Sequence, residues 1–184
     1  MLSRQDAWDL LCAWTPSERL RIHGRAVELV MRDFAEHQGQ DIEAFGVAGL
    51  LHDADYDQWP EEHPTRIVAH LRNLHEEEIA HAISAHFTRW GVQYNTLMDK
   101  ALLASDEITG FVVACALVRP QRLEGLEPKS VFKKLKTPAF AAGVDRLEVA
   151  AGFQMLEEAV GLSAEAHLQR IISVLHQHHE ELGL

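Results

Sequence analysis

Long hydrophobic runs are absent from this chain of 184 residues. The longest apolar stretch, Ile108 to Val118, is interrupted by Thr109 and Gly110 and would extend about 16 Å as a helix, roughly half of a bilayer core. The N-terminal residues MLSRQDAWDL also lack the basic segment and apolar run of a signal peptide. We therefore expect no membrane crossing.

Cysteine is scarce as well, because the chain contains only Cys12 and Cys115. Both fall on predicted apolar helix faces, which favours buried thiols in the reducing environment of the cytoplasm. Hydrophobic residues make up 47% of the chain and charged residues 24%, a balance that excludes disordered and collagen-like proteins. The length is typical of one globular domain covering residues 1–184.

Positive charge is also in deficit, since 17 basic residues stand against 28 acidic ones and the net charge is −11. This balance argues against nucleic acid as a general partner. The exception is the basic segment, Arg119 to Lys136, which holds six basic and two acidic residues. The basic segment is either a solvated helix face or a surface that binds phosphate groups of a ligand.

Helical periodicity extends over almost the whole chain, and no strand of useful length is predicted. A signal for a helix start precedes most of the periodic stretches, including a serine, threonine or aspartate that can cap the first turn. We therefore predict an all-α helical bundle. The expected starts are at Ser3, Thr15, Asp41, His63 to Thr65, Thr96, Asp145 and Ser163.

Several histidines and acids lie at positions suited to a metal site. His23 and His86 fall on apolar helix stripes, so both are expected to point inward. His52 and Asp53 are adjacent where a helix should end, which lets both face one ion. Asp106 lies on another apolar stripe and needs a cation, because an unpaired buried charge costs several kcal/mol.

Other histidines and acids near these positions have simpler interpretations. Asp55 and Asp57 are expected to serve the turn after Asp53. The remaining histidines are expected on helix surfaces or in a solvated tail, and none of them enters the predicted site: His37, His70, His75, His81, His167, His176, His178 and His179.

The order of these residues resembles that of the HD-domain superfamily, a group of all-helical, metal-dependent phosphohydrolases. The resemblance covers about residues 19 to 119. It is carried by His23 in RIHGRAVELV, the His52-Asp53 pair in LLHDADYD, His86 in IAHAISAHF and Asp106 in ALLASDEITG. Through EEHPTRIVAHL, DEITGFVVACALVRP and KSVFKKLKTPAFAAGVDR, the chain is also similar to bacterial HD proteins described as predicted hydrolases, without an assigned substrate.

The resemblance implies a first divalent metal ion held by four ligands, namely His23, His52, Asp53 and Asp106. It implies a second ion held by His63 and His86, with Asp53 as the bridge. If this second site is absent, His86 would instead bind phosphate or carry a proton. Imidazole and carboxylate ligands suit Mn, Fe, Co, Ni or Zn, and Mg is the remaining candidate.

The implied activity is hydrolysis of a phosphoester in a small phosphorylated metabolite or nucleotide, by water that the metal activates. Asp53 or Asp106 would orient or deprotonate this water. A basic residue would hold a phosphoryl oxygen, and the candidates are Arg119, Lys133 and Lys134.

Three alternatives stay open. One is a phosphodiesterase for cyclic nucleotides or dinucleotides, although the Gly-Tyr-Pro signature of one such branch is missing after His86. Another is a ligand-sensing domain that keeps the HD fold without catalysis. The third is an iron-dependent oxygenase. A homodimer is the default expectation for the assembly.

Overall fold

The computed structural model describes residues 2–184, which form ten α-helices and one 3₁₀ helix and no β-strand. The predicted all-α bundle is therefore confirmed. The chain divides into two compact units, residues 1–102 and residues 103–184. The expectation that the whole chain forms one domain stays a prediction.

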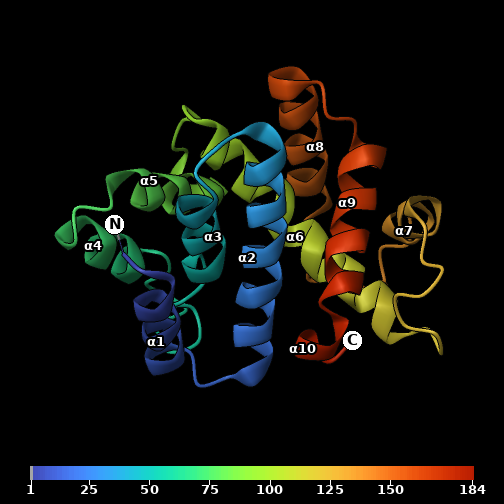
Figure 1. Cartoon of the computed structure of the whole chain (residues 1–184), viewed down its shortest axis with the longest axis horizontal. Helices are drawn as coiled ribbons and strands as arrows, with labels where there is room; N and C mark the ends of the chain where they lie inside the picture. Colours follow the sequence, from blue (N-terminus) through green and yellow to red (C-terminus); the bar gives the residue numbers. More distant parts are fainter. Residues whose placement is uncertain (1) are drawn as a thin grey trace. The chain divides into compact units, whose positions relative to one another are not determined.

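The first unit contains five complete helices, the 3₁₀ helix and the first turns of α6. Helix α3 packs against α1, α2 and α5, and α4 packs against α5 (Figure 1). The elements are α1 (Arg4–Trp14), α2 (Glu18–Gln38), α3 (Ile42–Leu51), α4 (Thr65–Asn73), α5 (Glu77–His86), η1 (Thr88–Trp90) and α6 (Leu97–Leu117).

Helix α3 forms the centre of this unit because every residue from Ala44 to Leu51 is buried. It lies very close to α2 at two glycines. A Cβ atom at Gly49 would lie 2.9 Å from the carbonyl oxygen of Val27, and one at Gly24 would lie 2.8 Å from the carbonyl oxygen of Leu50. Only glycine permits so close an approach of the two backbones.

The second unit consists of the remainder of α6 and four further helices. Helix α9 packs against α7, α8 and α10. These helices are α7 (Pro128–Leu135), α8 (Arg146–Val160), α9 (Ala164–Gln177) and α10 (His179–Leu182). Among the described residues, no helix has both the length and the apolar content needed to cross a membrane.

Four of the predicted helix caps are confirmed by hydrogen bonds, since the side chains of Ser3, Asp41, Asp145 and Ser163 accept from amides in the first turns of their helices. The prediction that Thr15 caps α2 is wrong. Ser17 caps this helix by accepting from the Leu20 amide, while the buried Thr15 hydroxyl donates to the Ala54 carbonyl oxygen at 3.0 Å.

The two cysteines differ in their surroundings. Cys115 is buried as expected, and burial raises the pKa of its thiol to about 11. Cys12 is exposed, so the prediction of two buried thiols is wrong for this residue. The buried face of α1 is formed instead by Ala7 and Leu11.

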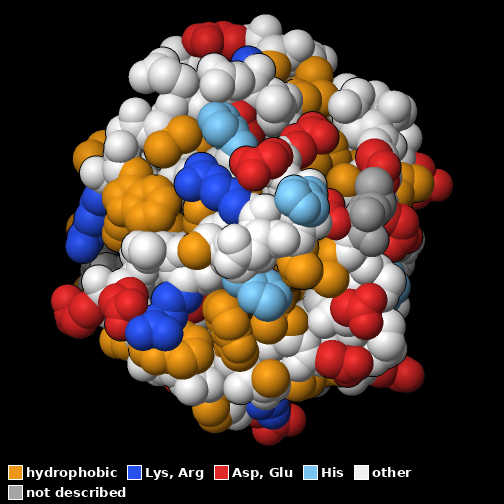
Figure 2. Space-filling model, turned by 90° about the vertical axis from the view of Figure 1, so that its left-hand side faces the viewer, with side chains coloured by type: hydrophobic (Ala, Val, Ile, Leu, Met, Phe, Trp, Pro, Cys, Tyr) orange, Lys and Arg blue, Asp and Glu red, His pale blue; other side chains and the backbone are white. Residues whose placement is uncertain are grey.

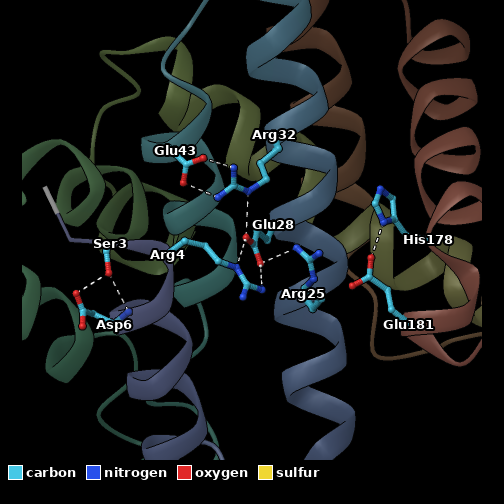
Figure 3. A network of polar contacts seen from close by, with 9 residues as sticks. All are labelled: Ser3, Arg4, Asp6, Arg25, Glu28, Arg32, Glu43, His178 and Glu181. Carbon is cyan, nitrogen blue, oxygen red and sulfur yellow. Dashed lines mark hydrogen bonds and ion pairs between the residues drawn. The ribbon is translucent and has the colours of Figure 1, made fainter.

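A buried ion-pair network joins α1, α2 and α3 (Figure 3). At its centre is the fully buried carboxylate of Glu28, whose Oε1 lies 3.0 Å from Nε of both Arg4 and Arg32. Its Oε2 lies 2.9 Å from Nη1 of Arg25. Arg32 also makes two hydrogen bonds of 2.6 and 2.7 Å to Glu43 at the start of α3. The network therefore links the α2–α3 pair by charge as well as by packing.

His167 in α9 is buried, so its predicted place on the surface is wrong. Its Nε2 donates to the carbonyl oxygen of Ala104 at 3.1 Å, and its ring lies 6.2 Å from that of Phe153. Burial lowers the pKa of His167 to about 4 and outweighs the opposing effect of this hydrogen bond. The folded protein therefore keeps this imidazole neutral at pH values where the unfolded chain protonates it.

We expect His167 to make the protein less stable in acid. Between pH 6.5 and about 4 the folded state binds fewer protons at this residue than the unfolded state. The free energy of unfolding therefore decreases as the pH is lowered, by about 3 kcal/mol over the full window. His167→Gln keeps an N–H donor for Ala104 but does not titrate. Urea unfolding of both proteins across this pH range should give a shallower dependence for the variant, and parallel curves would contradict the assignment.

Candidate metal centre

Histidines from four segments of the first unit surround the carboxylate of Asp53. His23 lies on α2, His52 directly follows α3, His63 precedes α4 and His86 is the last residue of α5. Oδ2 of Asp53 lies 3.5 Å from Nε2 of His52, whereas Oδ1 lies 3.4 Å from Nε2 of His63 and 3.7 Å from Nε2 of His86. The two oxygens of one carboxylate thus face different histidines.

These side chains form two groups of three potential ligands that share Asp53. In each group the donor atoms lie within 4.8 Å of one another. Imidazole nitrogen and carboxylate oxygen are the donors that borderline divalent ions prefer, so the residues present fit such an ion. The groups are His23, His52 and Asp53, and Asp53, His63 and His86.

The orientation of three of these imidazoles is fixed by hydrogen bonds at Nδ1. His52 donates to the Gly49 carbonyl oxygen at 2.8 Å and His86 donates to the Ile83 carbonyl oxygen at 2.6 Å. Because a carbonyl oxygen can only accept, Nδ1 carries the proton and the lone pair of the neutral ring is on Nε2. This is the tautomer that binding of a metal through Nε2 requires, and Nε2 is the atom that faces Asp53 in both residues.

The third imidazole, that of His63, donates from Nδ1 to a carboxylate. Oδ1 of Asp55 accepts at 2.7 Å, while Oδ2 accepts from the amides of Arg66 and Ile67 at 3.0 and 2.9 Å. Sequence reasoning assigned Asp55 only to the turn and missed this contact. The neighbouring Asp57 does bind backbone, since its Oδ2 accepts from the Ser17 amide at 2.6 Å.

The fold brings His23 and His52 together through the close contact of α2 and α3. Gly24 follows His23 directly, and Gly49 lies one turn before His52. Helix α3 then ends at His52, and successive turns carry the chain away, with the Tyr56 amide bonding the Asp53 carbonyl oxygen at 3.0 Å. The rings of His23 and His52 lie 5.1 Å apart between their centroids.

The electrostatic environment favours an ionised Asp53. Burial opposes ionisation, but the positive charge and the hydrogen bonds that His52 and His86 supply in their protonated forms outweigh it and hold the pKa of this carboxyl well below its usual range. The histidines His52, His63 and His86 are buried, whereas the Asp53 side chain keeps 25% of its surface exposed. Buried imidazoles therefore line the site, and the Asp53 carboxylate that the two ligand groups share is accessible to water.

The first unit as a whole is acidic, with nine basic and 17 acidic residues up to Leu102. On the face shown in Figure 2, acidic side chains are more widespread than basic ones, and histidines lie beside both charged and apolar side chains. A phosphorylated ligand would be repelled by this charge unless cations at the site offset it.

Five of the six predicted metal ligands thus lie together, and their role as ligands stays a prediction. The sixth, Asp106, is half-buried on α6 in the second unit and is part of neither group. The three predicted phosphate-binding residues also belong to the second unit. There, Arg119 donates to the Glu124 carbonyl oxygen at 2.9 Å, Lys133 is exposed, and Nζ of Lys134 lies 4.2 Å from the centre of the Phe140 ring.

Comparison with known protein families shows the family of this chain. The family model of the HD domain matches residues 20–123 of the sequence, more than half of the chain. HD domains bind divalent metal ions, and the histidine and aspartate groups described above could hold one. No curated protein and no solved structure matches the chain. The chain belongs to the HD domain family.

Proposed function

We propose that the protein is a metal-dependent phosphohydrolase that cleaves a phosphoester of a small phosphorylated metabolite or nucleotide. The observation that carries this proposal is the position of Asp53, whose two oxygens face different histidines. A carboxylate that bridges two ions needs this arrangement. The HD family, whose members are generally hydrolases, supports the same reaction class.

In this proposal each half of the site holds one ion. His23 and His52 would bind the first, with Asp106 as a further ligand, and His63 and His86 would bind the second. When bound, the ions would lower the pKa of water toward neutrality and offset the charge of the phosphoryl group. Without them, the acidic first unit offers little positive charge to a phosphoester.

The chain's own residues would orient the reactants. The exposed edge of Asp53 can accept a hydrogen bond from the attacking water, and Asp106 is the second candidate for this task. We also propose that the basic segment holds the phosphoryl oxygens through Arg119, Lys133 or Lys134. A charged donor of this kind contributes about 1.5 to 3 kcal/mol per hydrogen bond.

Phosphate release tests the proposal. The protein, freed of metal by chelation and then reloaded with Mn, should release phosphate from at least one member of a panel of nucleotides, sugar phosphates and model phosphoesters. The chelated protein should be inactive, because the first unit has too little positive charge to act alone. Cyclic dinucleotides in the same panel, followed by chromatography, test the diesterase alternative.

The same assay tests the basic segment. Lys134→Ala should raise KM for the substrate found, whereas Lys129→Ala, an exposed lysine of the same segment, should leave KM unchanged. Equal kinetics for both variants would identify the basic segment as a solvated surface. Silence of the reloaded protein on the whole panel would contradict the phosphohydrolase proposal itself.

A further inference from the structure

We propose that Asp55 is a positioning residue that keeps the proton of His63 on Nδ1, so that Nε2 is available to a metal ion. Asp55 thereby sets the metal affinity of the ligand group formed by Asp53, His63 and His86. The inference rests on the metal centre of the proposed function. It adds a residue outside both ligand groups and predicts that the two halves respond differently when this residue is changed.

The geometry of Asp55 leaves it almost no freedom. The side chain is fully buried, and its two oxygens have separate tasks. Oδ2 accepts from the amides of Arg66 and Ile67 in the first turn of α4, which fixes the carboxylate to the helix terminus. Oδ1 accepts from Nδ1 of His63 at 2.7 Å. The imidazole is thus fixed to α4 through a single carboxylate.

This contact distinguishes His63 from two other histidines of the site. His52 and His86 donate from Nδ1 to backbone carbonyl oxygens, whereas His63 donates to a carboxylate. A carboxylate behind an imidazole fixes its tautomer and makes the opposite nitrogen a stronger donor to a metal. That nitrogen, Nε2 of His63, lies 3.4 Å from Asp53. Asp55 therefore acts on the His63 and His86 half of the centre.

Asparagine at this position cannot replace both tasks of the carboxylate. If its amide NH₂ faces the Arg66 and Ile67 amides, donors meet donors at the start of α4. If the amide is flipped, its NH₂ faces Nδ1 of His63 and favours the tautomer with the proton on Nε2, which cannot bind a metal through that nitrogen. Asp55→Asn should therefore weaken the ligand or its support in either orientation.

The inference is tested by titrating the metal-free protein with Mn. Calorimetry gives the affinity of each site, and elemental analysis of the dialysed protein gives the number of bound ions. We expect wild type to bind two ions and Asp55→Asn to bind one ion with unchanged affinity and the other about 10- to 100-fold more weakly. Asp57→Asn is the matched control, because this carboxylate also accepts from a backbone amide in the same loop but contacts Ser17. It should bind both ions as wild type does.

A double variant separates positioning from a general structural role. His63→Gln should also lose one ion, and adding Asp55→Asn to it should cause no further loss of metal affinity, since both changes act through the same imidazole. A further loss in the double variant, or Asp55→Asn with two ions at wild-type affinity, would overturn the inference. So would a wild type that binds fewer than two ions. Loss of one ion by Asp55→Asn in a protein that hydrolyses nothing would support the inference and contradict the proposed function.

Discussion

Replacing Asp53 with alanine is expected to abolish phosphate release and to remove both metal ions, while the helical content of the protein is retained. Asp53 is the residue shared by the two ligand groups. Bound metal contributes several kcal/mol of transition-state stabilisation, so kcat/KM should fall by at least about 1,000-fold. Phosphate release, elemental analysis and circular dichroism of the same preparation measure the three quantities.

Two further variants make this result interpretable. Glu61→Ala removes an exposed acid eight residues further along the chain and should leave metal content and activity unchanged. Asp53→Asn keeps the shape of the side chain but offers only one oxygen acceptor, so it should bind fewer ions than wild type. Wild-type metal content in Asp53→Ala would show that the ions bind elsewhere.

Replacing Glu28 with alanine is expected to cause the largest loss of stability. The substitution leaves Arg4, Arg25 and Arg32 around a buried cavity without their shared carboxylate. Breaking a buried charge network by removing one partner costs about 3 to 5 kcal/mol. For a chain of this length, that corresponds to a fall in melting temperature of about 10 °C. Thermal unfolding measured by circular dichroism gives this value.

Glu43 provides the matched control for Glu28. It also pairs with Arg32, but 56% of its side chain is exposed. Exposed ion pairs contribute about 0 to 1 kcal/mol, so Glu43→Ala should change the melting temperature only slightly. Equal losses for Glu28→Ala and Glu43→Ala would mean that burial of the Glu28 carboxylate does not decide the energetics of the network.

Much of the fold follows from local sequence signals. The N-caps Ser3, Asp41, Asp145 and Ser163 are each made by a side-chain oxygen within three residues of the amide it accepts from, so the pattern of one segment contains the whole interaction. The buried position of His86 likewise follows from the apolar spacing of its own helix.

Most of the predictions that were wrong or incomplete concern contacts between distant segments. The Thr15 hydroxyl donates to the Ala54 carbonyl oxygen, 39 residues further along the chain, and Asp55 accepts from the Arg66 amide of helix α4. Local periodicity in the sequence predicts neither hydrogen bond. His167 is buried because it can donate to Ala104, 63 residues earlier in the chain. Cys12 is exposed because the buried stripe of α1 is narrow.

Two helical glycines are a further sequence signal of the candidate site. Gly24 and Gly49 lie inside helices, where glycine weakens the helix, and each is within three residues of a predicted ligand. Such glycines indicate a close approach of two backbones. They predict that the segments carrying His23 and His52 cross in close contact, as the structure places them.

An anomalous difference map from crystals of the protein grown with Mn would show directly whether Asp53 is shared by two metal ions. We expect two peaks, one beside His23 and His52 and one beside His63 and His86, with Asp53 in contact with both. A single peak that Asp53 does not touch, or peaks only on other residues, would contradict the claim that Asp53 is the shared ligand of the centre.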